Sequence, residues 1–170
     1  MVKCYTSFIY WIDTTGLDWQ SDEIIHLTIT DLLGNIVFSH LFKPVKIKSW
    51  DPTLQGFHIT LEDVANQPAF NEYLPTLQKL FNQVDTLIGF GNTTFDDWFL
   101  QQAEIKLPQV MEVDVQQQLF KRYQLFDHAP SIYECADYFH YPLNPKTADY
   151  TDYLKAVAYC YCQILEKYTN

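Results

Sequence analysis

The chain has 170 residues, of which 48% are hydrophobic, so we expect a single folded domain over residues 1–170 rather than a disordered chain. Its formal net charge is −10, with one arginine among its eleven basic residues, and this balance opposes long-range attraction to a phosphate backbone. Binding of nucleic acid would therefore need bridging metal ions or a local basic patch, and the densest group, Lys43, Lys46 and Lys48, is more typical of a solvated loop.

The first three predicted elements form an antiparallel meander. Aromatic and β-branched residues predict a strand over residues 5–12, and two more strands follow over 23–31 and 35–44. Gly34 lies in the short connection between the second and third strands, as a hairpin turn favours. Polar and apolar residues alternate in the second strand, which predicts burial on one face only. The polar positions are His26, Thr28 and Thr30.

Helices and short strands make up the rest of the chain. Residues 44–57 contain two prolines and Gly56 without a regular period, so we expect a loop there. Residues 60–63, Thr-Leu-Glu-Asp, match a capping box, and a longer helix is predicted from about 70 to 83. The apolar segment 85–91 predicts a short strand that is buried on both faces.

The second half alternates further between the two kinds of element. We expect a helix from about residue 94, a strand within 109–115, and helices over 115–124, 131–140 and 147–168. This order predicts an α/β fold with a mixed central sheet, antiparallel in its first three strands and parallel after them, flanked by helices. Sites in such sheets form where strand ends meet helix starts, so we expect Asp13 and Asp96 to come together.

Cysteine spacing and the lengths of the apolar runs indicate whether the protein binds zinc, crosses a membrane or is secreted. The cysteines are Cys4, Cys135, Cys160 and Cys162, and no pair has the spacing of a zinc knuckle. No segment reaches the roughly 18 apolar residues of a membrane span, and the N-terminal apolar run is too short for a signal peptide. We expect a cytoplasmic protein with reduced thiols and no membrane association.

Two motifs carry a resemblance to a known family. The first strand runs into Trp11-Ile12-Asp13-Thr14-Thr15-Gly16-Leu17, and residues 91–100 read GNTTFDDWFL. They resemble the motifs D-x-E-T-T-G-L and H-N-x-x-F-D-x-x-F-L of the DnaQ-like (DEDD-type) 3′–5′ exonucleases, which include the proofreading subunit of DNA polymerase III and oligoribonuclease. Residues 146–152 give the best fit to the third motif, H-x-A-x-x-D-A. The resemblance implies a ribonuclease-H-like fold.

The same resemblance implies a reaction, phosphodiester hydrolysis with two Mg²⁺ or Mn²⁺ ions held by four carboxylates and a histidine base. At the matching positions, Asp96 keeps its carboxylate and Asp13 replaces a glutamate. The aspartate that bridges both ions is replaced by Trp11, whose indole offers an N–H and no oxygen. We therefore expect at most a weak metal site, on Asp13 and Asp96.

The third motif departs from the family as well. Lys146 stands in the position of the base, and Thr151 stands in the position of the last aspartate. Asp152 lies one residue further and about 100° around the helix, while Asp149 faces elsewhere. If the helix is shifted, Asp152 joins Asp13 and Asp96 as a catalytic carboxylate.

Two main hypotheses follow from these substitutions. In the first, the chain is a catalytically degenerate binding or interaction module without a cofactor, and Trp11 fills the metal space beside Asp13, whose face it shares. The acidic charge then favours a protein partner slightly over single-stranded nucleic acid. In the second, it is an active exonuclease on single-stranded DNA or short RNA with a rearranged Mg²⁺ or Mn²⁺ site. The remaining expected pocket residues are Thr14, Thr15, Asn92 and Phe95. A third reading, an unrelated α/β protein, would need several ordered coincidences.

Overall fold

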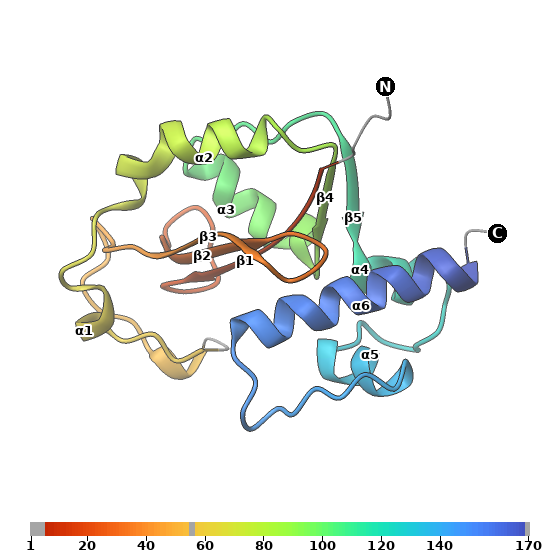
Figure 1. Ribbon diagram of the computed structural model, residues 1–170. Helices are drawn as coiled ribbons and strands as arrows, with labels where there is room; N and C mark the ends of the chain where they lie inside the picture. The colour runs from red at the N-terminus through yellow and green to blue at the C-terminus, as the bar shows by residue number, and fades with distance from the viewer. Residues whose placement is uncertain (1–5, 55–56, 169–170) are drawn as a thin grey trace.

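Five strands form one mixed sheet in the order β3-β2-β1-β4-β5 in the computed structural model (Figure 1). Strand β1 (Ser7–Thr14) pairs antiparallel with β2 (Ile24–Thr30), which pairs antiparallel with β3 (Ile36–Leu41). On its other edge, β1 pairs parallel with β4 (Thr86–Gly89), and β4 pairs parallel with β5 (Met111–Asp114). The mixed sheet predicted from the sequence is confirmed.

The structure describes residues 6–54 and 57–168. Cys4, Tyr5 and Gly56, which the sequence predictions included, lie outside the described residues. The helical elements, in chain order, are η1 (Pro52–Leu54), α1 (Leu61–Val64), η2 (Phe70–Tyr73), α2 (Leu74–Phe81), η3 (Asn92–Thr94), α3 (Asp96–Gln102), α4 (Val115–Gln117), η4 (Gln118–Arg122), α5 (Ile132–Tyr138) and α6 (Tyr150–Tyr168).

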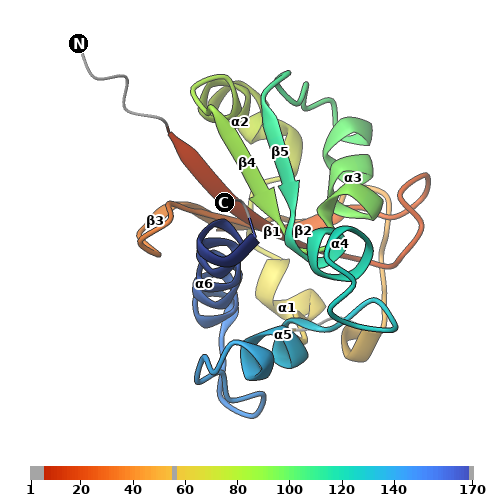
Figure 2. The ribbon, with the colours of Figure 1, turned by 90° about the vertical axis from the view of Figure 1, so that its right-hand side faces the viewer.

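Helices cover both faces of the sheet, and Figure 2 shows α6 and α3 on opposite sides of it. On one face, Ile9 and Ile88 belong to the same apolar cluster as Leu154 of α6. On the other face, the cluster includes Tyr10 with residues of α2 and α3. Alternate residues of β1 thus face two separate cores, because successive side chains of a strand point to opposite faces.

Short local motifs set the ends of several elements as the sequence predicts. Gly34 adopts a positive φ of 82° in the β2–β3 turn, which glycine allows without steric cost. Thr60 caps α1: its hydroxyl accepts from the Asp63 N–H, and the Asp63 carboxylate accepts from the Thr60 N–H at 2.8 Å. Both ends of the predicted capping box are therefore present.

The structure corrects the prediction that β2 is buried on one face only. Every residue of β2 is buried, because α6 covers the face that carries His26, Thr28 and Thr30. The ring of Tyr150, at the start of α6, packs against the His26 ring with 4.8 Å between centroids. The period of two identifies which side chains share a face, but the long helix that covers the polar face lies at the far end of the chain.

Several element boundaries also differ from the predictions. Strand β1 continues to Thr14 because Asp13 and Thr14 still pair with β2. The helix predicted from 70 to 83 is a 3₁₀ turn followed by α2, which begins with Leu74 and has Pro75 in its first turn. The helix predicted from about residue 94 begins at Asp96, after the 3₁₀ turn η3.

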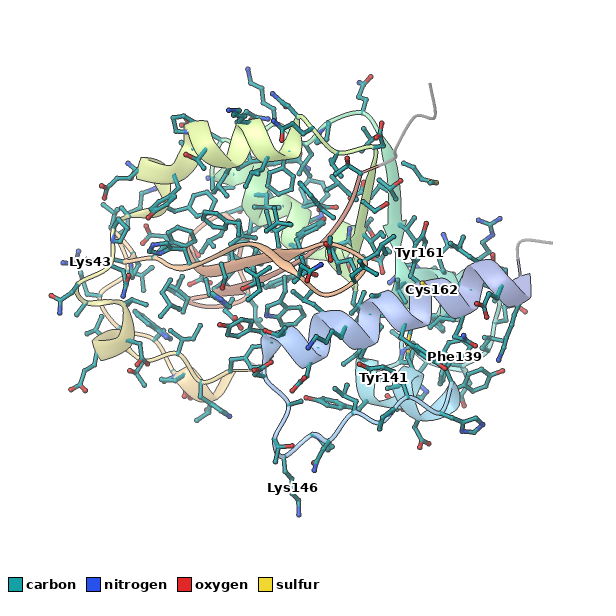
Figure 3. All side chains as sticks on the ribbon, in the orientation of Figure 1. Lys43, Phe139, Tyr141, Lys146, Tyr161 and Cys162 are labelled. Atoms are coloured by element: carbon teal, nitrogen blue, oxygen red, sulfur yellow. The ribbon has the colours of Figure 1, made fainter. Side chains whose placement is uncertain are left out.

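Two further properties concern the whole of the described chain. None of its helices within residues 6–54 and 57–168 is long and apolar enough to cross a membrane. Cys135, Cys160 and Cys162 are free thiols. Figure 3 shows Lys146 projecting from the connection between α5 and α6, away from the sheet.

Candidate functional site

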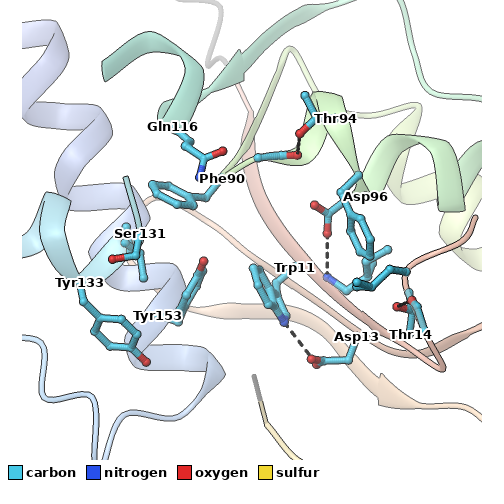
Figure 4. Close-up of a pocket in the computed structure, with 16 residues that line it drawn as sticks. Trp11, Asp13, Thr14, Phe90, Thr94, Asp96, Gln116, Ser131, Tyr133 and Tyr153 are labelled. Atoms are coloured by element: carbon cyan, nitrogen blue, oxygen red, sulfur yellow. Dashed lines mark hydrogen bonds between the residues drawn. The ribbon is translucent and has the colours of Figure 1, made fainter. Parts of the chain in front are cut away.

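Trp11 and Asp13 lie side by side on β1, as the period of two predicts. The Trp11 indole Nε1 donates a hydrogen bond of 3.2 Å to Asp13 Oδ2 (Figure 4). The same oxygen lies 2.9 Å from His26 Nδ1, because the register of β1 and β2 sets Asp13 opposite His26. Asp13 is buried, and its Oδ2 lies within hydrogen-bond distance of two ring nitrogens, Trp11 Nε1 and His26 Nδ1.

Aromatic rings enclose Trp11 on the side away from the sheet. The Tyr153 ring of α6 lies 4.5 Å from the Trp11 ring between centroids, and the Phe57 ring lies 6.2 Å away at nearly a right angle. Phe90, the residue after β4, contacts the Tyr153 ring edge-to-face with 6.3 Å between centroids. The indole is thus part of the packing between β1 and α6.

Asp96 starts α3 and is buried beside β1. Its Oδ1 accepts a hydrogen bond of 3.2 Å from the Ile12 N–H. Burial raises the pKa of the Asp96 carboxyl to about 7, and the nearby charges of Asp13 and Asp114 act in the same direction, whereas the backbone N–H groups of Ile12 and of Asp96 itself oppose the change. Asp96 therefore lies close enough to Asp13 for the two carboxylates to influence each other, as expected.

A pocket of about 440 Å³ opens between the end of β1 and the helices α3, α5 and α6. Of the residues expected at the site, Trp11, Asp13, Thr14, Phe95 and Asp96 line it. The other liners include rings and neutral polar groups that the motifs did not indicate, namely Phe90, Gln116, Ser131, Tyr133 and Tyr153. The pocket therefore brings together the first two motifs, and none of its lining residues belongs to the third.

The third-motif residues lie elsewhere, at the start of α6. Asp149 Oδ1 accepts from the N–H groups of Thr151 and Asp152, at 2.8 and 2.9 Å, and so satisfies the first turn of the helix. Lys146 is exposed. The side chain that α6 presents to the pocket is Tyr153, one residue after Asp152. Several tyrosines lie near Tyr153 in the sequence, and no local pattern distinguishes it from them.

Thr15 and Asn92 do not line the pocket either. Thr15 is tied to the β1–β2 connection, where its hydroxyl donates to Asp22 Oδ1 at 2.9 Å and accepts from the Glu23 N–H. Asn92 is fully buried, and its Nδ2 donates to the Tyr10 hydroxyl at 2.9 Å and to Glu112 at 3.2 Å. It therefore belongs to a second polar cluster on the other side of the sheet.

That second cluster is a buried acid network that the motifs did not indicate. The Tyr10 hydroxyl donates to Asp97 Oδ1, and among the described residues Asn92 Oδ1 has no hydrogen-bond partner. Burial and the neighbouring Glu112 carboxyl raise the pKa of Asp97 well above its ordinary value. The doublet Asp96-Asp97 is the only sequence signal for this arrangement, because adjacent residues at a helix start point in different directions.

A pair of divalent ions does not fit these side chains. The position of the bridging carboxylate holds an indole, and Asp13 Oδ2 is engaged by Trp11 and His26. No residue matched to the third motif lines the pocket, and α6 presents the Tyr153 ring there instead. Within the described part of the chain, no group of three or more His, Cys, Asp or Glu residues could hold a metal ion. What the site offers is two buried carboxylates, Asp13 and Asp96, on the wall of a largely aromatic pocket.

Comparisons with known proteins identify the family of the chain and solved structures that share its fold. A family model described as Exonuclease matches residues 10–168. Solved structures of exonuclease I share the fold. A zinc-bound E. coli complex with single-stranded DNA has 14% identity and a TM-score of 0.75, and the match covers 99% of this chain and 42% of that one. The enzyme of Methylocaldum szegediense has 16% identity and a TM-score of 0.73, and a complex with SSB-Ct has 13% identity and a TM-score of 0.75; each match covers 98% of this chain and 42% of the other. The chain thus spans less than half of these structures, and no curated protein matches its sequence.

Proposed function

Because the chain belongs to the exonuclease family and has the DnaQ-like, ribonuclease-H-like fold, we propose that it is a binding module whose two-metal catalytic centre has been lost. The observation that carries the proposal is the hydrogen bond from Trp11 Nε1 to Asp13 Oδ2. Trp11, which stands in the position of the bridging aspartate, offers no oxygen to a metal ion. Its indole N–H also occupies an oxygen of Asp13, the next expected ligand. A metal ion at Asp13 Oδ2 would have to displace this bond as well as bind.

The packing around Trp11 supports the same proposal. The rings of Tyr153 and Phe57 contact the indole, so the space beside Asp13 is filled from two other parts of the chain. A single lost ligand can leave the rest of a metal site intact. Here β1, α6 and the loop that carries Phe57 have side chains fitted to one another, which favours a different use for the pocket.

A protein partner fits the charge of the chain better than nucleic acid does. Exonuclease I structures include complexes with single-stranded DNA and with SSB-Ct, so either kind of ligand has a precedent on this fold. The present chain carries a net charge of −10, and two carboxylates line its pocket. A phosphate group would meet repulsion there unless metal ions neutralised it.

A second candidate function is a residual exonuclease activity on single-stranded DNA or short RNA. It is favoured by one observation, that Asp13 and Asp96 both line the pocket and could share one Mg²⁺ or Mn²⁺ ion. In this reading the ion either binds Asp13 Oδ1 or opens the Trp11–Asp13 hydrogen bond at Oδ2.

Digestion of 5′-labelled single-stranded DNA and a matching RNA separates the two functions. The protein, in excess over substrate, is incubated with Mg²⁺, Mn²⁺ or EDTA, beside the variants Asp96→Asn and Asp137→Asn, and the latter changes an exposed residue of α5. We expect no metal-dependent ladder from any of the three. A ladder that is lost in Asp96→Asn and kept in Asp137→Asn would show that the chain is a nuclease. A ladder shared by all three comes from a contaminant, and the preparation is repeated until it is absent.

A further inference from the structure

The pocket has the composition of a site for a cation. Five aromatic rings line it, and the only charged side chains among its lining residues are the carboxylates of Asp13 and Asp96. The rings are Trp11, Phe90, Phe95, Tyr133 and Tyr153. Aromatic faces attract cations through their electron-rich surfaces, and the attraction grows when water is excluded. A positive, partly planar group therefore meets favourable surfaces on several sides.

Asp96 provides the acceptor that such a group needs. Its Oδ1 is engaged by the Ile12 N–H, and Figure 4 shows the other carboxylate oxygen on the side of the pocket, facing the aromatic residues. Asp13 lies further along the same wall but shares Oδ2 with Trp11 and His26. A carboxylate oxygen on the pocket wall beside aromatic rings suits a group that both stacks and donates hydrogen bonds.

We propose that this pocket binds the guanidinium group of an arginine from a protein partner. The inference rests on the proposed function, since it assigns a ligand to a pocket in which the family's two-metal centre has been lost. Guanidinium is planar, remains charged, stacks on aromatic faces and donates several hydrogen bonds to carboxylates. An ammonium group carries the same charge but lacks the flat face.

Access and long-range charge agree with this assignment. Leu17, which lines the pocket, is 70% exposed, and Thr94 and Ser131 at its edges are exposed too, so a side chain can enter from solvent. The volume of about 440 Å³ lies within the range of small-ligand sites. The net charge of −10 attracts a basic partner and speeds its encounter.

The test is a titration of the full chain with short capped peptides, in which binding is monitored through the indole N–H resonance of Trp11 in NMR spectra. The probes are acetyl-Gly-Arg-Gly-amide, the same peptide with lysine or with neutral citrulline, and a short oligothymidylate. We expect the arginine peptide to shift the Trp11 resonance and to bind at least about tenfold more tightly than the citrulline peptide, because a charged hydrogen bond is lost in the latter. The lysine peptide should bind more weakly than the arginine peptide.

Variants assign the binding to the pocket. Asp96→Asn keeps an oxygen for the Ile12 N–H and should weaken arginine binding about tenfold, whereas Asp137→Asn on α5 should leave it unchanged. Tyr133→Leu keeps apolar volume on the wall, removes a ring face and should weaken binding several-fold. If Asp96→Asn unfolds, Tyr133→Leu still tests the pocket.

Three outcomes would overturn the inference. They are equal binding of the citrulline or lysine peptide, oligothymidylate binding at the Trp11 resonance without arginine binding, and arginine binding that neither pocket variant weakens. None of these depends on nuclease activity. A metal-dependent ladder in the digestion experiment would instead overturn the proposed function, so the two failures are distinguishable.

Discussion

The rings of Trp11 and Tyr153 lie 4.5 Å apart between centroids, at an angle of 53°, and join the central strand β1 to the C-terminal helix α6. Aromatic pairs at such distances contribute about 0.5–1.5 kcal/mol beyond the area that they bury. Trp11 stands in the first motif of the family resemblance, and Tyr153 follows directly after the residues matched to the third. The indole that replaces the bridging aspartate therefore also stabilises the packing of α6 on the sheet.

Removal of the Trp11 ring should destabilise the fold. We expect Trp11→Ala to lower the free energy of unfolding by about 3 kcal/mol, because it leaves a cavity beneath α6. Trp11→Phe keeps a ring and loses the hydrogen bond to Asp13, so its cost should be smaller, about 1–2 kcal/mol. Urea denaturation measures both, with Trp98→Ala, at a residue that is 46% exposed, as the control. An equal loss in Trp11→Ala and Trp98→Ala would contradict the structural role.

Stability should fall as the pH rises toward neutrality. The folded state raises the pKa of Asp96 from 3.8 to about 7, so between these values the folded protein keeps a proton that the unfolded chain has released. The unfolded state then binds fewer protons, and the free energy of unfolding decreases with pH across this interval. We expect the urea midpoint to be higher at about pH 5 than at about pH 8. Asp97, whose pKa is also raised, acts in the same direction.

The variant Asp96→Asn isolates this contribution, because it removes the titrating group and retains an oxygen for the Ile12 N–H. Its unfolding free energy should change less with pH than that of the unmodified protein. Asp137→Asn, which alters an exposed carboxylate, should keep the original dependence. If Asp96→Asn has the same pH dependence as the unmodified chain, the carboxyl of Asp96 does not titrate as described.

The buried network around Tyr10 should contribute to stability independently of the pocket. The Tyr10 hydroxyl donates to Asp97 and accepts from Asn92 Nδ2, so Tyr10→Phe leaves two buried polar groups without this partner. We expect a loss of about 1–3 kcal/mol in the free energy of unfolding. Tyr138→Phe, at a residue that is 44% exposed, should cost under about 0.5 kcal/mol. Similar losses in the two variants would argue against a structural role for the network.

Much of the fold is predictable from local patterns. The meander, the turn at Gly34 and the capping box at Thr60 each depend on neighbours in the sequence, and all three are present. The complete burial of β2 was missed because it depends on α6, more than 100 residues further along the chain. Alternation identifies which side chains share a face of a strand, but it does not indicate what covers that face.

The candidate site is likewise predictable only where its geometry depends on neighbours in the sequence. The period of two placed Trp11 beside Asp13, and motif spacing brought Asp96 to them. The third motif was assigned by strict spacing, yet the rotation of α6 turns Tyr153 toward the pocket. On a helix, one residue changes the direction of a side chain by about 100°, so an uncertain start makes the inward face unpredictable.

A last prediction concerns the loop that follows β3. Glu23 holds it through three backbone N–H groups: Oε1 accepts from Val45 at 2.9 Å, and Oε2 accepts from Lys46 at 2.8 Å and Ile47 at 2.7 Å. Hydrogen bonds to a charged carboxylate contribute about 1.5–3 kcal/mol each, and 1.4 kcal/mol corresponds to tenfold in an equilibrium. Glu23→Ala should therefore accelerate hydrogen exchange at these three amides by about tenfold or more.

The effect should be local, because the core strands do not depend on this carboxylate. Amides of β1 and β2 should keep their protection in Glu23→Ala, and Glu23→Gln, which retains one acceptor oxygen, should give an intermediate rate at residues 45–47. Glu62→Ala, at an exposed residue of α1, serves as the matched control and should leave the loop unchanged. Unaltered exchange at residues 45–47 in Glu23→Ala would mean that the loop is held by its apolar contacts rather than by Glu23.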